Sequence, residues 1–491
     1  MFTPSLEEAM EYVSDYKYVP IKKEILSDIK TPIQVLKILK NYSTHVYMLE
    51  SVENQERYGR YTFLGFKPCA CFTCLNGHLQ VIDDKGNVLH EEDTPHPALY
   101  LKKLLKNYRS PKMKDFPTFT GGLVGYFAYD YIKYSEPTLS LDALDEEHFR
   151  DVDLMLFDKV IAFDHLKQKI VVIANAKTDN LKESYKQAER DIEEIIDLIK
   201  NGKEAKIEKG RLTSDYRKLF EEDAFCKMVE KAKHYIYEGD IFQVVLSNRL
   251  EADFDGSLFD TYRMLRTINP SPYMFYFSGD DLEVAGASPE TLVKLENGVL
   301  HTYPLAGTRK RGATEAEDLA LEKELLADEK ECAEHNMLVD LGRNDIGKIS
   351  EFGSVCVEKY MNIERFSHVM HIGSTVRGEL KKECHELDAV DAILPAGTLS
   401  GAPKIRACEI INELENNKRG IYGGAIGYVD FTGNLDTCIA IRIAFKKNGK
   451  VFVRSGAGIV ADSVPKNEFI ECINKAKAVM TAIEKSQEME D

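Results

Sequence analysis

The stretch that decides the fold class is FCKMVEKAKHYIYEGDIFQVVLSNRL, residues 225–250. Its first part carries apolar residues at helical spacing, namely Phe225, Val229, Ala232 and Ile236. Gly239 stands where such a helix would end, and IFQVVLSNRL after it is typical of a strand. This stretch therefore predicts a helix followed directly by a strand.

Hairpin signals on both sides of this stretch indicate how the strands pair. Both central residues of a type I′ turn need positive φ, which Asn-Gly pairs tolerate. Such pairs occur at Asn76-Gly77, Asn297-Gly298 and Asn448-Gly449. Long helices are predicted at residues 315–342 and 465–486. We therefore predict an α+β fold, with large antiparallel sheets packed with helices in two interlocked, sandwich-like domains, and not a βαβ repeat.

One charged stretch is the best candidate linker. It is NGKEAKIEKGRLTSD, residues 201–215, and it follows a helical pattern rich in Glu and Ile. A chain of 491 residues is long enough for two or three domains. We place an N-terminal domain at residues 1–200 and a second domain at residues 216–491.

Composition and charge disfavour several classes of function. The 64 Lys+Arg against 81 Asp+Glu give a net charge of −17, which repels nucleic acid and anionic membrane surfaces. No apolar run approaches the ~18 to 20 residues that span a bilayer. The ten cysteines are scattered, and the first residues carry neither the basic nor the apolar region of a secretion signal. We therefore expect a reduced, cytoplasmic protein.

Two apparent motifs have better ordinary explanations. The segment SGAGIVA, residues 455–461, matches a dinucleotide fingerprint, but the strand before it is the second arm of a hairpin and Pro465 delays the next helix. We expect a loop whose amides approach another anion, such as a carboxylate. The candidate zinc ligands Cys69, Cys71, Cys74 and His78 alternate along a hairpin and would not converge.

Two pairs of glutamates are more informative. Glu331 and Glu334 are three residues apart on a predicted helix, and Glu468 and Glu471 repeat that spacing. Such pairs usually lie on solvated faces, but the second one flanks an apolar stripe that would draw it toward the protein. Two facing pairs would repel one another unless a divalent cation lay between them, and oxygen-only ligands suit Mg²⁺.

Three glycine-rich turns lie elsewhere in the second half, at residues 303–312, 395–404 and 422–430. Each alone could be ordinary turn chemistry. Together with the basic residues Arg442 and Lys475 they indicate a pocket for a small polyanion.

Many ordered segments between about residue 45 and residue 485 resemble the chorismate-utilising enzymes, and within them the branch that makes anthranilate. They include GDIFQVVLS, GASPETLV, YPLAGTRKRG, DEKECAEHNMLVDLGRNDIG, PAGTLSGAPKIRA, YGGAIGYVDFTGNLDTCIAIR and SGAGIVADSVPKNEF. Lys466 and Cys472 depart from the family pattern, but they lie between the expected ligands.

The resemblance implies a reaction and its residues. Ammonia would add to the ring of chorismate, the ring hydroxyl would leave, and pyruvate would be eliminated to give anthranilate. Glu290 would protonate the departing hydroxyl. His371 would remove the ring proton, although a buried structural histidine is the competing interpretation. Mg²⁺ would be held directly by Glu334 and Glu471 and through water by Glu331 and Glu468.

The resemblance also assigns the substrate contacts. The enolpyruvyl carboxylate would lie on Arg442, with Tyr422 beside it. Backbone amides and further polar contacts would come from Gly307, Thr308, Thr398, Gly456, Ala457, Gly458 and Lys475.

Two positions separate the branches of this family. Relatives that add water to chorismate have a lysine base where this chain has Gln243, and those that make aminodeoxychorismate have a lysine where it has Ala306. Both absences favour anthranilate. No cysteine lies in a G-x-C-x-G glutaminase motif. The resemblance therefore implies a separate glutamine amidotransferase subunit as the source of ammonia.

The segments LES, residues 49–51, and NPSPYM, residues 269–274, resemble the family's tryptophan-feedback site. It would be formed by Ser51, Pro272, Tyr273 and Met274. Three alternatives stay open: an aminodeoxychorismate synthase, a salicylate synthase, and a catalytically silent tryptophan sensor. A sensor has no use for the buried charges of the catalytic set, which argues against the third.

Overall fold

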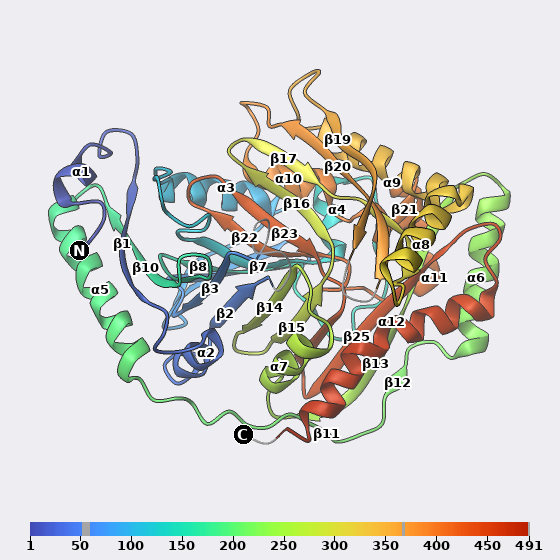
Figure 1. Cartoon of the computed structure of the whole chain (residues 1–491), viewed down its shortest axis with the longest axis horizontal. Coiled ribbons are helices and arrows are strands. Elements are labelled where there is room, and N and C mark those ends of the chain that lie inside the picture. The colour runs from blue at the N-terminus through green and yellow to red at the C-terminus, as the bar shows by residue number, and fades with distance from the viewer. Residues whose placement is uncertain (52–58, 366–368, 490–491) are drawn as a thin grey trace.

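The large antiparallel sheets predicted from the sequence form the centre of the molecule, and there are two of them among the described residues. The computed structural model describes residues 1–51, 59–365 and 369–489. In these residues two large antiparallel sheets pack face to face, and helices cover their outer faces (Figure 1). The predicted α+β class is therefore confirmed.

The first sheet has 13 strands among the described residues. In spatial order they are β1 (Tyr18–Leu26), β10 (Lys169–Lys177), β9 (Lys159–Asp164), β3 (Tyr61–Phe66), β2 (Val46–Glu50), β14 (Tyr273–Ser278), β15 (Glu283–Ser288), β24 (Ile443–Lys447), β25 (Lys450–Ile459), β13 (Gln243–Asp255) and β11 (Arg211–Leu212). Two further strands, β12 (Arg217–Lys218) and β21 (Gly401–Ala402), also pair with β13.

The second sheet has 12 strands over the same described ranges. Their order is β18 (Leu305–Lys310), β20 (Val369–Glu379), β17 (Val299–Thr302), β16 (Thr291–Glu296), β23 (Leu435–Ile439), β22 (Ala425–Asp430), β7 (Gly122–Phe127), β8 (Val152–Phe157), β4 (Ala70–Leu75), β5 (His78–Asp83) and β6 (Val88–Asp93). Strand β19 (Cys356–Arg365) pairs with β20.

The helices form the outer layers. They are α1 (Leu6–Met10), α2 (Pro32–Lys40), α3 (Pro97–Tyr108), α4 (Ile132–Ser135), α5 (Leu181–Asn201), α6 (Glu222–Tyr237), α7 (Phe259–Ile268), α8 (Glu315–Ala327), α9 (Glu329–Gly347), α10 (Glu386–Ile393), α11 (Lys404–Glu415) and α12 (Pro465–Ser486), with 3₁₀ turns η1 (Tyr129–Tyr131) and η2 (Gly397–Leu399). Helices α2, α5, α7 and α12 pack on the first sheet, and α3, α9 and α10 on the second.

Aromatic side chains fill the space between the sheets. Tyr47 and Phe275 of the first sheet and Tyr126 of the second are all fully buried there. Because alternate strand residues point to opposite faces, their neighbours face the helices instead.

Strands from both sides of the predicted linker occur in each sheet. Strand β2 pairs with β14 in the first sheet, and β7 pairs with β22 in the second. Residues 202–208 form neither helix nor strand, and β11 and β12 then join β13. The two halves of the chain are thus interlocked by strand pairing. The boundaries at 1–200, 201–215 and 216–491 stay a prediction.

Local turn chemistry explains most of the predicted elements. The three Asn-Gly pairs join β4 to β5, β16 to β17 and β24 to β25, each with positive φ at both residues. The predicted helix 465–486 is α12. The single helix predicted at 315–342 is wrong, because Asp328 accepts hydrogen bonds from the amides of Lys330 and Glu331 and starts a second helix there. In the described ranges, no helix combines the length and apolarity needed to cross a membrane.

Candidate active site

A cavity of about 640 Å³ lies between strands of both sheets and two helices. Its walls come from β13 and β25, from β18 and β20, and from α9 and α12. Most of the residues predicted for catalysis, substrate and metal line it: Gln243, Glu290, Gly307, Thr308, Glu331, Glu334, His371, Thr398, Tyr422, Arg442, Gly456, Gly458, Glu468, Glu471 and Lys475. Ala457 does not, because its side chain points to the opposite face of β25 and is fully buried in the core.

Glu290 lies between β15 and β16, where its carboxyl reaches the cavity. Its backbone amide donates to Ser288 Oγ at 3.3 Å, and its Oε1 accepts a hydrogen bond from Thr398 Oγ1 at 2.9 Å. Burial raises the pKa of Glu290 to about 7, although the Thr398 hydroxyl and the charge of Lys475 favour its ionised form. Such a carboxyl can hold a proton at neutral pH and donate it to a leaving group.

His371 comes from β20 and lies against the glycine turn of β18. Its Nδ1 is 2.9 Å from the carbonyl oxygen of Gly307 and 3.1 Å from Thr308 Oγ1. Because a carbonyl oxygen can only accept, we assign the proton of the neutral ring to Nδ1, which makes Nε2 the basic atom. Burial lowers the pKa of His371, which favours this neutral form.

Gln243 is the first residue of β13 and is almost fully buried. Its Nε2 donates to Glu334 Oε1 at 3.5 Å, a long contact. Its Oε1 has no hydrogen-bond partner among the described residues. A buried acceptor without a partner is costly, so this oxygen is suited to receive an N–H group from a ligand in the cavity.

Arg442 lines the same cavity, and its φ is positive, at 55°. Its Nη1 donates to Asn269 Oδ1 at 3.3 Å, and burial lowers its pKa. Across the described ranges no carboxylate forms an ion pair with it. A desolvated guanidinium of this kind matches a carboxylate ligand with its planar pair of donors.

The end of β25 forms one wall of the cavity. The segment 455–461 was expected to be a loop, but residues 455–459 continue the strand and pair with β13 alone, because β24 pairs only with residues 450–453. A Cβ at Gly456 would lie 3.0 Å from the Tyr422 hydroxyl, and one at Gly458 would lie 2.6 Å from Gln243 Nε2. At Gly456 the carbonyl oxygen of Leu246, at 2.8 Å, also leaves no room for a side chain, and at Gly458 the end of the Gln243 side chain occupies the space.

The four predicted metal ligands come from the first two turns of α9 and of α12. Glu331 lies 3.7 Å from Arg309, and Glu471 lies 2.7 Å from Lys475. Burial, and then the neighbouring carboxylate of the same helix, raise the pKa of both Glu331 and Glu468.

This donor set fits a hard divalent cation, because it consists of carboxylates that repel one another. In the part of the chain that the structure describes, no three His, Cys, Asp or Glu side chains form a group that could hold a metal ion as they stand. Binding would therefore require the glutamates to leave Arg309, Gln243 and Lys475.

The two segments predicted to bind tryptophan lie side by side in the first sheet. Glu50 of β2 pairs with Met274 of β14, so Ser51 follows next to Tyr273. The Tyr273 hydroxyl donates to Asp436 at 2.8 Å, and Pro272 and Met274 are buried. Residues 52–58, which follow Ser51, lie outside the described ranges.

Sequence reasoning missed three buried residues at the cavity: Arg454, which lines it, and Glu415 and Arg419, which bind one another behind it. Arg454 could have been noticed as a charged residue within the apolar strand KVFVR. Glu415 and Arg419 could not be noticed in this way, because they lie in a polar stretch, where charged residues are ordinary.

Known proteins resemble the chain over its whole length. Residues 44–481 match the family described as chorismate binding enzyme. The anthranilate synthase component 1 of Acetivibrio thermocellus is 46% identical over 502 aligned residues, which cover 100% of each chain. That of Aquifex aeolicus (strain VF5) is 45% identical, with 99% of each chain covered.

Solved structures share the fold. Anthranilate synthase component I from Streptococcus pneumoniae TIGR4 has a TM-score of 0.76 and 38% identity, covering 93% of this chain and 98% of that one. The menaquinone-specific isochorismate synthase from Escherichia coli has a TM-score of 0.70, covering 98% of this chain and 99% of that one. At 19% identity, this second likeness concerns the fold alone.

Proposed function

This chain belongs to the chorismate-binding enzymes, and from that premise we propose that it converts chorismate and ammonia to anthranilate and pyruvate, a step in tryptophan biosynthesis. It is a chorismate-utilising lyase. The observation that carries the proposal is the pairing in one cavity of Gln243, whose Oε1 is buried without a partner, with Glu290, whose pKa burial raises to about 7.

The first step is amination of the ring. Ammonia donates a hydrogen bond to Gln243 Oε1 and attacks the ring carbon, forming the C–N bond. Glu290 gives its proton to the ring hydroxyl, whose C–O bond breaks to release water. The new ammonium group then loses one proton, which balances the proton that Glu290 gave. Neutral ammonia needs no base for attack, whereas water would, and glutamine cannot act as that base.

The second step is elimination. His371 Nε2 removes the ring proton at the carbon that carries nitrogen. The bond between the ring and the enolpyruvyl oxygen breaks, the ring becomes aromatic, and the enolpyruvate takes a proton to become pyruvate. Arg442 and Tyr422 hold the enolpyruvyl carboxylate, and Thr398 and Lys475 add polar contacts. The strand end at Gly456 and Gly458, with Ala457 between them, and the turn at Gly307 and Thr308 bring backbone close to the ligand.

We propose that Mg²⁺ is held by Glu334 and Glu471 directly and by Glu331 and Glu468 through water. When bound, the ion would neutralise the ring carboxylate and polarise it. The raised pKa of Glu331 and Glu468, which comes from burial and then from carboxylate repulsion, supports a cation between the helices.

We propose that a separate glutamine amidotransferase subunit delivers the ammonia in the cytoplasm. The name of the relatives, anthranilate synthase component 1, implies a second component. None of the ten cysteines lies in a G-x-C-x-G motif, which supports a separate subunit as the source of ammonia.

We propose that residues 1–200 bind tryptophan near Ser51 and regulate residues 216–491, with 201–215 as the linker. The support is a short structural link: Asn269, which begins the segment NPSPYM, accepts a hydrogen bond from Arg442 at 3.3 Å. A ligand that moves this segment would shift the residue that holds the substrate carboxylate. Tryptophan would thus favour a state with lower affinity for chorismate.

Replacement of Ser51 by a bulkier residue tests this regulation. Ser51→Phe should fill the tryptophan site, and we expect normal activity without inhibition. The measurement is anthranilate formation as a function of tryptophan concentration. Ser140→Phe, at an exposed loop position, is the control and should stay inhibited. Unchanged inhibition of Ser51→Phe would show that the site is elsewhere.

Gln243→Lys tests the choice of nucleophile. The lysine amine should activate water and displace ammonia, so amination should fall and some hydroxylated product should form. Product analysis by mass, with ammonium present, measures both. Gln187→Lys on the exposed face of α5 adds the same charge and should behave as the unchanged chain. Undiminished anthranilate from Gln243→Lys would mean that this position does not select the nucleophile.

The function itself is tested with the purified chain, chorismate, ammonium and Mg²⁺. We expect fluorescent anthranilate and an equal amount of pyruvate, and no product when Mg²⁺ is removed. Aminodeoxychorismate would accumulate without pyruvate release, and a water-adding relative would work without ammonium. A tryptophan sensor would bind tryptophan and form no product.

A further inference from the structure

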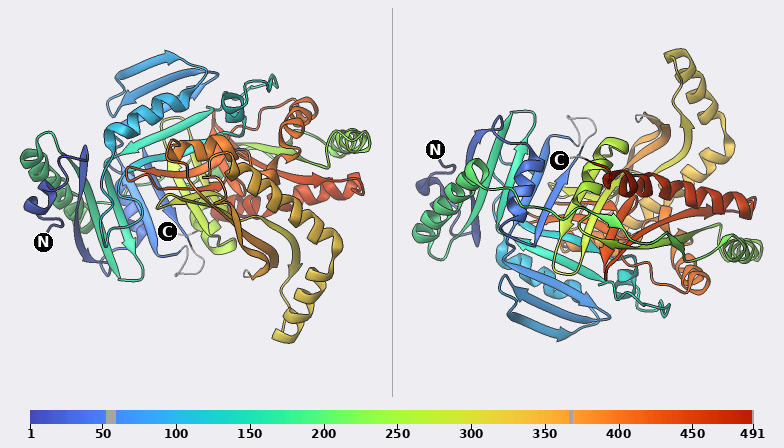
Figure 2. Two further views of the ribbon diagram at one scale, coloured as in Figure 1. Left: turned by 90° about the horizontal axis from the view of Figure 1, so that it is seen from above. Right: turned by 90° about the horizontal axis from the view of Figure 1, so that it is seen from below.

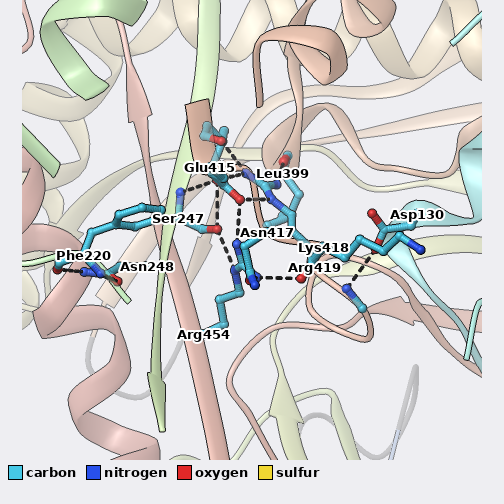
Figure 3. A network of polar contacts seen from close by, with 12 residues as sticks. Asp130, Phe220, Ser247, Asn248, Leu399, Glu415, Asn417, Lys418, Arg419 and Arg454 are labelled. Carbon is cyan, nitrogen blue, oxygen red and sulfur yellow. Dashed lines mark hydrogen bonds and ion pairs between the residues drawn. The ribbon is translucent and has the colours of Figure 1, made fainter. Parts of the chain in front are cut away.

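A cluster of buried charges adjoins the cavity, and the proposed reaction uses none of its members, of which only Arg454 lines the cavity. Glu415, Arg419 and Arg454 are each 2% exposed. Two donors of the Arg419 guanidinium bind the Glu415 carboxylate: Nε at 3.0 Å and Nη2 at 2.6 Å (Figure 3). Arg454 Nη2 adds a third contact at 2.7 Å, and the Ser247 amide adds a fourth at 2.7 Å. Every oxygen of this carboxylate is therefore satisfied, as a buried charge requires.

The remaining donors of Arg419 reach two backbone carbonyls. Nη1 donates to Leu399 O at 2.6 Å, and Nη2 donates to Val245 O at 2.6 Å. Leu399 ends the 3₁₀ turn η2, and Val245 lies on β13. One guanidinium thus connects the turn to the strand.

Each of these carbonyls belongs to a residue that is one or two positions from a residue of the acid or nucleophile site. Leu399 follows Thr398, whose hydroxyl donates to Glu290 Oε1 at 2.9 Å. Val245 lies two residues after Gln243 and faces the same cavity. Backbone contacts also hold the end of this turn, because the Leu399 amide donates to Ala396 O and the Val245 amide donates to Ser400 O at 2.9 Å. Arg419 adds the side-chain link that joins Leu399 O, next to Thr398, to Val245 O of β13.

We propose that Arg419 is a positioning residue for the acid step: it fixes the turn η2 so that Thr398 holds Glu290 in place for protonation of the leaving hydroxyl. Glu415 and Arg454 orient the guanidinium for this task. The inference rests on the proposed function, in which Glu290 is the acid. It adds a residue that touches neither substrate nor the reacting atoms.

The variant that tests the proposal is Arg419→Lys. Lysine keeps the charge, but its single ammonium cannot hold Glu415, Leu399 O and Val245 O together. We expect kcat to fall by about 10²-fold, as displacement of a catalytic group by about 1 Å does, with KM little changed. Arg406→Lys is the matched control, because Arg406 lies on α11 and forms ion pairs with Asp240 and Glu409, and none of these three residues lines the cavity.

The pH profile separates positioning from a purely structural role. Thr398 of η2 and Lys475 of α12 act on the Glu290 carboxyl, and His371 of β20 lines the same cavity. Loss of the Thr398 hydrogen bond removes a contact that favours the ionised form. The basic limb of the activity profile should therefore move to higher pH in Arg419→Lys, in the same direction as in Thr398→Val. A role in folding alone would lower the melting temperature and leave this limb in place.

A double-mutant cycle completes the test. Because both variants act through the Thr398–Glu290 contact, Arg419→Lys and Thr398→Val together should cost little more than either one alone. Additive effects, or an unmoved basic limb, would overturn the inference. If Arg419→Lys does not fold, the same measurements are made on Glu415→Gln. Its amide has one oxygen, so it cannot accept from Arg419 Nε and Nη2 on two separate oxygens as the carboxylate does. Inactive unmodified enzyme would refute the proposed function instead.

Discussion

Glu290→Gln should lower kcat by roughly 10³-fold, because general acid catalysis contributes about 10²- to 10⁴-fold and glutamine has no acidic proton. The side chain keeps its size and its contact with Thr398, so binding should change little. Anthranilate fluorescence with ammonium measures the loss. Amination by ammonia and any water addition introduced by Gln243→Lys should both disappear, since both require the hydroxyl to leave.

If Glu290 is the acid, the activity of the unmodified enzyme should also depend on pH. Burial raises the pKa of Glu290 to about 7, so the acid stays protonated below that pH and activity falls as the pH rises through it. Glu296→Gln, on β16 outside the cavity, is the control and should retain full activity. If Glu290→Gln kept activity within about tenfold of the unmodified chain, another group would have to be the acid.

Arg442→Gln should raise KM for chorismate by roughly 10²-fold, because loss of one partner of a buried charged pair costs about 2–5 kcal/mol. Its guanidinium has no carboxylate partner within the described ranges, and its pKa is lowered by burial. We therefore expect a substrate carboxylate to pair with it. Steady-state kinetics at varied chorismate concentration measures the change.

Two comparisons make the result specific. Arg211→Gln removes the same charge from a side chain that is 71% exposed, and KM should not change. Arg442→Lys should recover part of the affinity, because it restores the positive charge but not the bidentate hydrogen bonding of a guanidinium. An unaltered KM in Arg442→Gln would contradict the assignment of this residue to the substrate.

Local signals in the sequence were enough for much of the fold. Asn-Gly turns located three hairpins because their backbone conformation is a property of those two residues. The break at Asp328 was missed because a side-chain cap competes with an otherwise continuous helical pattern. The end of β25 was mistaken for a loop, since glycines that make room for Tyr422 and Gln243 look like turn glycines in sequence alone.

In the site, too, local patterns predicted some features and not others. The spacing of Glu331 and Glu334, and of Glu468 and Glu471, placed each pair on one helical face. The partners that now hold them, such as Arg309 and Lys475, depend on how α9 and α12 meet the sheets. The helix pair α8–α9 projects from one side of the molecule (gold in Figure 2), and no local pattern predicts that placement. The cluster around Arg419 likewise joins residues from η2, β13, α11 and β25.

The most direct test of the account is to follow nitrogen from ammonium into product. The purified chain, without any amidotransferase, is given chorismate, Mg²⁺ and ¹⁵N-labelled ammonium, and the aromatic product is analysed by mass spectrometry beside the amount of pyruvate. We predict anthranilate that carries one ¹⁵N atom, with one pyruvate released for each molecule. An unlabelled hydroxylated product, or a labelled product that still carries the enolpyruvyl group, would contradict the account.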